Sequence, residues 1–229
     1  NYEFLDYFQT PRLPRPTKLL SPSSWGLKHV EEQVDINTVL LRPPLDLDKF
    51  KLARENNFNR SGKKRFLHIE GLKAIHDRNG TESLLRALEL TNAEFELVIK
   101  TQGTEQLSSD SRVVYDNTNP TDNKDLYYDF DAIILPRRYG GLCLPMNEGL
   151  ASGLPVIMTD ISPNNDLLPK DWLVESTKTS SFMTRTEIDV YSVNEKELAK
   201  TIDYFVNMSD NGIRKGKELA FKIAQDNFD

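Results

Sequence analysis

The stretch from Arg137 to Ile157, RRYGGLCLPMNEGLASGLPVI, carries the features that decide the fold. It follows the apolar run DAIILP (131–136), which is typical of a strand buried on both faces. Two glycines, Gly140 and Gly141, separate that strand from a short helix, and Pro145 suits the first helical position. The chain is therefore expected to leave a buried strand through permissive backbone and to start a helix whose free amides face outward.

Strand-like and helical patterns alternate from about residue 37 to the carboxyl end. Apolar runs occupy residues 38–43, 65–70, 94–100, 112–115, 131–136, 154–159 and 172–176. Helical patterns occupy residues 79–90, 122–129, 145–152, a segment after Asn194, and about 212–224, whereas 45–64 is interpreted as a polar connection. Asn194 and Glu197 have the spacing of a capping box. This alternation predicts an α/β fold, a doubly wound parallel sheet wrapped by helices.

Composition narrows the classes of function. The chain has 229 residues, 29 basic and 35 acidic, with a net charge of −6, so no nucleic-acid partner is expected. No apolar run approaches the roughly 20 residues of a membrane-spanning helix, and we expect a cytoplasmic location. The single cysteine, Cys143, excludes an internal disulfide, and the three histidines lie far from it in sequence, so no metal site is expected.

Two loops that follow predicted strands carry unusual chemistry. In open parallel sheets, ligands bind beyond the carboxyl ends of strands, where the strand order reverses. The first loop, GLKAIHDRNG (71–80), supplies the cations Lys73 and Arg78. It also delivers Asn79 as the predicted N-cap of the next helix, with Glu82 completing a capping box.

The second loop contributes backbone groups. Gly140 and Gly141 let amides approach a ligand closely, and the amides around residues 142–144 form an anion seat at the helix start. Cations from one loop and amides from the other predict a diphosphate site. The predicted ligand-binding residues are Lys73, Arg78, Asn79, Gly80, Gly140, Gly141, Leu142, Cys143, Leu144 and Glu148. No residue is assigned a catalytic role.

Glu148 needs its own explanation, because a carboxylate near a helix start competes with an anion held there. It lies one turn into the helix, where it can accept hydrogen bonds from a ribose, as acidic residues do in dinucleotide-binding folds. We therefore expect Glu148 to accept hydrogen bonds from sugar hydroxyls, while the backbone amides bind the phosphates. Alternatively, it only stabilises the helix start.

These residues resemble the carboxyl-terminal, donor-binding half of the GT-B glycosyltransferases, in the retaining group called family 4. The resemblance covers about residues 20–228 and is most specific over 131–160. Its segments are LLSPSSW (19–25), LRPPLD (41–46), GLKAIHDRNGTESLLRAL (71–88) and DAIILPRRYGGLCLPMNEGLASGLPVIMTD (131–160). It implies a Rossmann-like fold and retaining transfer from a nucleotide sugar, which is the donor substrate and not a cofactor. We expect the transfer to be metal-independent, because the amides, Lys73 and Arg78 can neutralise the leaving diphosphate.

The resemblance also implies a division of the chain. Residues 1–36 are expected to be the tail of a preceding acceptor domain with the crossover, and 37–229 the nucleotide-sugar donor-binding domain. The acceptor domain is the implied partner, and without it the chain is expected to bind the donor but to transfer little. In the family, the residue matching Glu148 contacts the donor ribose, and basic residues matching Lys73 and Arg78 contact the diphosphate.

Two departures from the family pattern affect this expectation. The family places a second glutamate eight positions before Glu148, where it holds donor-sugar hydroxyls, and this chain has Gly140 there. Asn79 replaces the lysine that usually precedes the loop glycine, which leaves Arg78 to carry the charge. Glycosyl transfer remains the leading interpretation, and Gly140 leaves one alternative, a non-catalytic module that binds nucleotides but lacks the sugar-binding carboxylate. A dinucleotide oxidoreductase is disfavoured because no G-x-G-x-x-G run opens a helix.

Several residues near these loops remain open to ordinary explanations. Arg137 and Arg138 either contact a sugar or phosphate in the space left by Gly140 or point to water. His68, inside a predicted strand, is interpreted as a hydrogen-bonded core residue. Cys143 lacks a paired base in the sequence, so a nucleophilic role is disfavoured.

Overall fold

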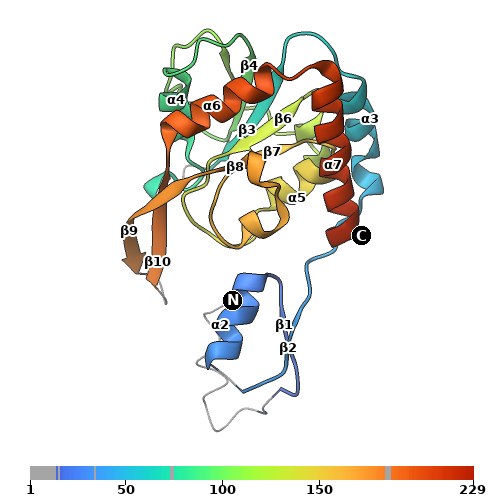
Figure 1. Ribbon diagram of the computed structural model, residues 1–229, viewed down its shortest axis with the longest axis vertical. Coiled ribbons are helices and arrows are strands. Elements are labelled where there is room, and N and C mark those ends of the chain that lie inside the picture. Colours follow the sequence, from blue (N-terminus) through green and yellow to red (C-terminus); the bar gives the residue numbers. More distant parts are fainter. Residues whose placement is uncertain (1–13, 15, 34, 73–74, 184–186) are drawn as a thin grey trace.

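A computed structural model describes residues 14, 16–33, 35–72, 75–183 and 187–229. Its centre is a six-stranded parallel sheet in the order β5-β4-β3-β6-β7-β8, shown in Figure 1. The strands are β3 (Arg65–Gly71), β4 (Glu96–Thr101), β5 (Val113–Asp116), β6 (Ala132–Leu135), β7 (Val156–Thr159) and β8 (Leu173–Val174). The chain builds outward from β3 to β5, returns to β6 beside β3, and then builds outward to β8. This order confirms the predicted Rossmann-like α/β fold.

The centre of the sheet is its most apolar part. All four residues of β6 and all four of β7 are buried, as expected for strands covered on both faces. The register pairs Phe66 with Ala132 and Leu67 with Ile133, so β3 and β6 lie side by side. Their carboxyl ends therefore emerge at the same edge of the sheet.

Helices cover both faces of the sheet. They are α3 (Lys51–Asn59), α4 (Thr81–Leu88), α5 (Leu144–Ala151), α6 (Glu195–Val206) and α7 (Asp210–Phe228). Helix α4 packs against α6, whereas α5 and α3 pack against α7 (Figure 1). Right-handed crossovers explain this division, since the chain moves in opposite directions from β3 and from β6. Short 3-10 segments complete the connections: η2 (Asp48–Phe50), η3 (Ile75–Asp77), η4 (Asn123–Tyr127), η5 (Asn164–Leu167) and η6 (Lys170–Trp172).

The helix boundaries confirm some predictions and correct others. Asn194 caps α6 through a hydrogen bond from the amide of Glu197, at 3.3 Å, as its spacing predicted. Helix α7 is longer than predicted, since Ser209 caps it and it extends to Phe228. Helix α3 was wrongly interpreted as a polar connection, because its buried face contains only Ala53 and the polar Asn57.

The N-terminal residues form a small unit beside the main sheet. It consists of β1 (Leu19–Ser21), α2 (Ser24–Gln33) and β2 (Thr38–Leu40), and β2 pairs in parallel with β1 in a separate sheet. In Figure 1 this unit lies below the body, joined to it by the segment after β2. Leu45 N donates to Phe228 O at 2.9 Å, and the hydroxyl of Ser24 donates to the carboxylate of Asp166.

A β-hairpin between β8 and α6 is absent from the sequence-based prediction. Its strands, β9 (Ser176–Met183) and β10 (Glu187–Val193), pair with each other and project from the body in Figure 1. Strand β9 consists largely of Ser and Thr, and β10 contains Ile188, Val190 and Val193, yet most of the side chains in each strand are exposed or half-buried. Without a buried apolar stripe, this pair produced no clear strand pattern.

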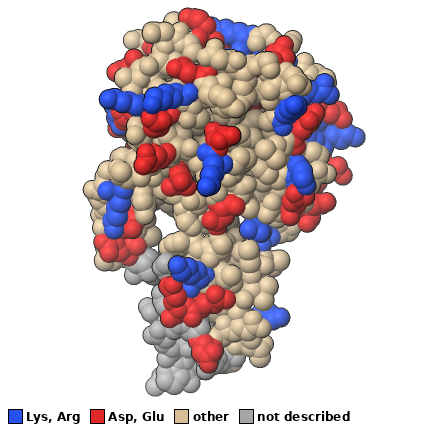
Figure 2. Space-filling view, in the orientation of Figure 1, with Lys and Arg blue, Asp and Glu red and all other residues tan. Residues whose placement is uncertain are grey.

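Charged side chains are mostly paired on the surface. Figure 2 shows basic and acidic residues interspersed over one face of the molecule. Surface pairs such as Lys222–Asp226, at 2.8 Å, are largely exposed and contribute little to stability. Within the described part of the chain, no helix combines the length and the apolar character needed to cross a membrane.

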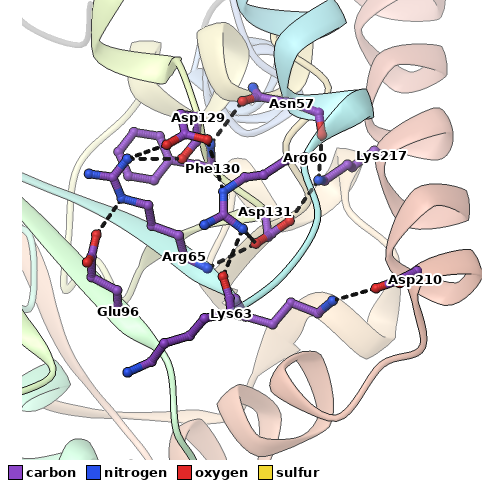
Figure 3. A network of polar contacts seen from close by, with 11 residues as sticks. Asn57, Arg60, Lys63, Arg65, Glu96, Asp129, Phe130, Asp131, Asp210 and Lys217 are labelled. Atoms are coloured by element: carbon purple, nitrogen blue, oxygen red, sulfur yellow. Dashed lines mark hydrogen bonds and ion pairs between the residues drawn. The ribbon is translucent and has the colours of Figure 1, made fainter.

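A buried ion network closes the amino-terminal edge of the sheet (Figure 3). Asp131, which is 1% exposed, accepts from Lys217 Nζ at 2.8 Å and from Arg60 Nη1 at 2.5 Å. The amide of Arg65 also donates to Asp131, at 2.9 Å, and Lys217 donates to the carbonyl oxygen of Asn57 at 2.6 Å. This network joins the starts of β3 and β6 to α3 and α7.

We expect Asp131→Ala to lower the free energy of unfolding by about 3–5 kcal/mol, because it leaves the buried Lys217 ammonium without its counter-charge. Denaturant unfolding measures this change. The matched control is Asp226→Ala, which breaks an exposed pair and is expected to cost less than about 1 kcal/mol. Equal losses in the two variants would contradict the assigned role of the network.

Candidate functional site

The two loops singled out in the sequence meet at the carboxyl edge of the sheet. The amide of Arg138, in the loop after β6, donates to the carbonyl oxygen of Arg78, in the loop after β3, at 2.9 Å. Arg78 and Leu142 line one cavity of about 340 Å3. Other residues that line it are Glu70, Asn79, Arg137, Cys143 and Leu144. The site thus lies where the strand order reverses, as predicted for ligand sites in this architecture.

Close packing of the two loops requires a glycine at position 80. A Cβ on Gly80 would lie 1.9 Å from the carbonyl oxygen of Pro136, and its φ of +74° is a conformation that other residues rarely adopt. The side-chain amide of Asn79 donates to Glu70 O at 2.6 Å, which anchors the loop to the end of β3. Lys73, the other predicted cation, lies outside the described residues.

The prediction that Asn79 caps α4 is wrong. His76 and Asp77 both have positive φ, at 57° and 48°, and this turn brings the Asp77 carboxylate beneath the helix start. That carboxylate accepts from the amides of Thr81 and Glu82, each at 3.0 Å. Burial raises the pKa of Asp77, and these amide hydrogen bonds oppose the shift. The start of α4 is therefore occupied by a carboxylate of the chain itself.

The start of α5 is different. Its N-cap residue, Cys143, makes no side-chain capping bond and is buried. Pro145 has no amide hydrogen, while Met146 and Asn147 donate to the carbonyl oxygen of Cys143 at 3.0 and 3.2 Å. Among the described residues, the amides of 142–144 have no acceptor. These amides, together with the helix dipole, favour an anion at this position.

Two arginines crowd the same cavity. Arg137 is 4% exposed, and the only hydrogen bond that its side chain makes to the described residues is a long one of 3.5 Å to the carbonyl oxygen of Leu142. The Nε atoms of Arg137 and Arg78 are both buried without a hydrogen-bond partner among the described residues. Burial lowers the pKa of Arg78, and the charge of Arg137 lowers it further. Among the described residues, neither guanidinium has a carboxylate partner, and two such groups side by side favour an anionic ligand.

Gly140 makes room for this arginine pair. A Cβ at Gly140 would lie 2.8 Å from Arg137 Nη2 and 3.4 Å from Arg78 Nε, and the φ of Gly140 is +116°. A side chain at position 140 would therefore displace the guanidinium of Arg137. Where the family pattern has a carboxylate, this chain places positive charge.

Glu148 faces the segment that precedes β6. Tyr127 Oη donates to Glu148 Oε2 at 2.6 Å, and the side-chain amide of Asn123 donates to Glu148 Oε1. Burial raises the pKa of Glu148, and the hydrogen bond from Tyr127 is the main opposing effect, followed by the charge of Lys49. Each carboxylate oxygen can accept a second hydrogen bond, so the expected role in ribose binding stays a prediction.

Arg138, unlike Arg137, fastens the hairpin to both loops. Its Nε donates to Tyr191 O at 2.9 Å, its Nη1 donates to His76 O at 2.8 Å, and its carbonyl oxygen accepts from Tyr191 N at 2.8 Å. Phe182 of β9 lies between the rings of His76 and Tyr139, with centroid distances of 5.2 and 5.1 Å. The hairpin therefore covers the outer side of the two loops, a feature that sequence reasoning missed.

His68 is a core residue, as its position in the sequence predicted. Its Nδ1 lies 2.8 Å from Ile134 O, and its Nε2 lies 2.9 Å from Thr81 Oγ1. These bonds join β3 to β6 and to the start of α4, directly beneath the two loops. Burial lowers the pKa of His68 to about 4, so the imidazole is neutral at pH 7.

Comparison with known proteins agrees with this geometry. The family described as Glycosyl transferases group 1 matches residues 63–187. No curated protein sequence matches the chain. Among the described residues, no group of His, Cys, Asp or Glu side chains is arranged to hold a metal ion.

Solved structures share the fold at low sequence identity. A glycosyltransferase from Rickettsia africae is similar at 18% identity with a TM-score of 0.71, over 100% of this chain and 63% of that one. Sucrose-phosphate synthase from Thermosynechococcus elongatus is similar at 16% identity with a TM-score of 0.67, over 93% of this chain and 54% of that one. HepE from Anabaena, solved with UDP-glucose, is similar at 13% identity with a TM-score of 0.64, over 94% of this chain and 60% of that one. The fold is thus that of GT-B enzymes, and the chain spans less than two thirds of each of these proteins.

We expect the stability of the chain to fall on acidification below pH 6.5, in part because of His68. The folded imidazole takes up its proton only near pH 4, whereas the unfolded one does so near 6.5. Between these values the unfolded state binds more protons than the folded state. His68 therefore lowers the free energy of unfolding by about 2 kcal/mol between pH 7 and pH 5.

Urea unfolding of the wild type and of His68→Gln at pH 7 and pH 5 tests this expectation. We expect the variant to be less stable than the wild type at pH 7. Its free energy of unfolding should, however, fall by about 2 kcal/mol less than that of the wild type between pH 7 and pH 5. The same pH dependence in both proteins would show that His68 titrates normally.

Proposed function

The chain belongs to the Glycosyl transferases group 1 family, and from this premise we propose that it is the donor-binding domain of a retaining GT-B glycosyltransferase of family 4. The donor is a nucleoside diphosphate sugar, and the glycosyl group is a hexose. The observation that carries the proposal is the cavity at the switch point, where Arg78, Arg137 and the amides before α5 converge. Acceptor binding is assigned to a preceding domain of which residues 1–36 are the tail.

The diphosphate is the part of the donor that this site fits best. Its negative charges offset two guanidinium groups that the described residues leave unneutralised. The same groups stabilise the leaving diphosphate as the glycosyl bond breaks, because charge builds up on its oxygens in the transition state. Arginines and amides can provide this stabilisation without a metal ion, so we propose metal-independent transfer.

Glu148 is proposed to orient the nucleoside. It lies on α5, whose amino-terminal amides hold the phosphates, and Tyr127 and Asn123 fix its carboxylate in one orientation. A carboxylate held in this way can accept hydrogen bonds from vicinal ribose hydroxyls. The raised pKa of Glu148 is compatible with this role, since hydroxyl donors stabilise the charged form.

One observation favours a second candidate function. The space beside Gly140 is filled by the guanidinium groups of Arg137 and Arg78, so the loop itself offers no carboxylate to donor-sugar hydroxyls. A module that binds nucleoside diphosphates without transferring sugar would have this arrangement. Tighter binding of sugar nucleotides than of the bare diphosphates supports transfer, and equal affinities support the binding module.

We expect Arg78→Ala and Arg137→Ala each to weaken binding of UDP, GDP or ADP by about 10- to 100-fold, the effect of losing a charge-assisted hydrogen bond. Isothermal titration calorimetry measures this on the 229-residue chain. Arg214→Ala, which removes a 67% exposed guanidinium on α7, is the matched control and should leave affinity unchanged. Nucleotide binding that survives both substitutions would refute the proposed diphosphate seat.

The role of Glu148 can be separated from that of the arginines by comparing two ligands. Glu148→Ala should weaken binding of a nucleoside diphosphate about tenfold and leave binding of inorganic pyrophosphate unchanged, since pyrophosphate has no ribose. Circular dichroism verifies that the variant is folded. Equal effects on both ligands would mean that Glu148 acts only through the shape of α5.

Metal independence is tested by the same titration with Mg2+ and with EDTA. The arginines neutralise the diphosphate in the proposed site, so the affinity should agree within about twofold between the two conditions. Arg138→Ala is unsuitable as a control for the Arg78 and Arg137 variants, because the guanidinium of Arg138 joins three segments of the site. Binding that disappears in EDTA would refute this part of the proposal.

A further inference from the structure

A second cavity, of about 440 Å3, lies beside the diphosphate site. Its volume falls within the range of small-molecule pockets, roughly 300 to 1,000 Å3. The hairpin β9–β10, helix α2, the loop after β6 and the segment after β7 each contribute to its walls. In Figure 1, the hairpin and α2 both lie below the main sheet, and four separate parts of the chain line the cavity.

Aromatic rings and a few polar groups line this cavity. Trp25 of α2, Tyr139 of the loop and Tyr191 of β10 provide the rings. Lys178, Glu187 and Asp189, all on the hairpin, provide the charges. Such a lining suits a ligand that has apolar C–H faces and also several hydroxyl groups.

The charged groups of this lining interact with neighbours on the hairpin. Lys178 Nζ lies 2.5 Å from Asp189 Oδ1, and the hydroxyl of Ser181 donates to Glu187 Oε1. The second oxygen of each carboxylate can still accept hydrogen bonds, and the ammonium can still donate. Neighbouring hydroxyls on one ring could use both kinds of group, which is the hydrogen-bonding pattern of a saccharide.

Electrostatics distinguishes the two cavities. The charged residues that line the first are Arg78, Arg137 and Glu70, with a net charge of +1, whereas those that line the second are two carboxylates and one lysine, with a net charge of −1. A phosphate therefore prefers the first cavity, and a neutral polyhydroxy ligand suits the second.

The two cavities share a thin wall. Gly140 and Gly141 line the second cavity, while the arginines against which a Cβ on Gly140 would pack line the first. Asn164 fixes this wall by donating to Gly141 O at 3.2 Å. A saccharide in the second cavity would thus lie next to a bound diphosphate, the proximity that glycosyl transfer requires.

We propose that the cavity enclosed by the hairpin, α2 and the glycine loop binds a neutral saccharide, with Glu187 and Asp189 accepting its hydroxyl hydrogens and Tyr191 packing against its ring. The inference deepens the proposed function and rests on it, because it assigns a sugar site beside the diphosphate. The saccharide is either the glycosyl group of the donor or a separate acceptor, and both share this chemistry.

Ligand-observed NMR and calorimetry on the 229-residue chain test the site with methyl glucoside, methyl galactoside, N-acetylglucosamine and maltose. At least one of these should bind, and Glu187→Ala and Tyr191→Ala should each weaken that binding at least tenfold. Both variants should keep the affinity for UDP, GDP or ADP within about twofold. Glu218→Ala, which removes an exposed carboxylate of α7, is the control for charge and should behave as the wild type.

Competition identifies the source of the saccharide. If a sugar nucleotide displaces the bound saccharide but the bare diphosphate does not, the cavity holds the donor glycosyl group. If the saccharide stays bound with either nucleotide present, the cavity holds an acceptor. Both results support the proposed site.

Two other results would overturn the inference. If nucleoside diphosphates bind but no saccharide does, or if Glu187→Ala and Tyr191→Ala bind saccharide as the wild type does, the cavity is not a sugar site and the proposed function stands. If neither class of ligand binds, the proposed function fails, and the inference fails with it.

Discussion

The parallel pairing of β3 with β6 is the constraint on which the site depends. Leu67 pairs with Ile133, and the connections that leave these two strands pass to opposite faces of the sheet. This divergence leaves a crevice between the two connecting loops. The amide of Arg138 closes it at its base by donating to Arg78 O at 2.9 Å. The loop after β3 supplies Arg78, and the loop after β6 supplies Arg137 and the amides before α5, so the proposed anion site draws on both loops.

Buried charges are neutralised at one edge of the sheet and lack a counter-charge among the described residues at the other. At the amino edge, Asp131 is surrounded by cations and an amide, so the charges there are neutralised within the chain (Figure 3). At the carboxyl edge, Arg78 and Arg137 have no carboxylate partner among the described residues. Burying unneutralised charge is costly, and this cost is offset when a ligand brings the missing charge. The first edge holds neutralised charge, and the second is where the proposed anion would bind.

Sequence patterns predicted what local periodicity determines. The apolar run at 131–136 and the glycines after it located β6, its loop and α5, and the spacing of Asn194 and Glu197 located the cap of α6. Asn79 was misassigned because its role depends on the turn that brings Asp77 to α4, and that turn has no periodic pattern. The roles of Arg137 and Arg138 could not be separated, since adjacent residues of the same type differ only in direction. The hairpin was missed because its strands pair only with each other and most of their side chains are exposed or half-buried.

Position 140 connects these observations. With no side chain there, Arg137 can lie beside Arg78, and the loop becomes more positive than one that holds a carboxylate at that position. The change strengthens the attraction for phosphate and removes an acceptor for sugar hydroxyls. Carboxylates are nevertheless close by, since Glu187 and Asp189 line the cavity on the other side of the same glycines. Phe182 holds the hairpin that carries them against both loops. In the proposed sugar site, the hairpin therefore supplies the hydroxyl acceptors that the glycine loop lacks.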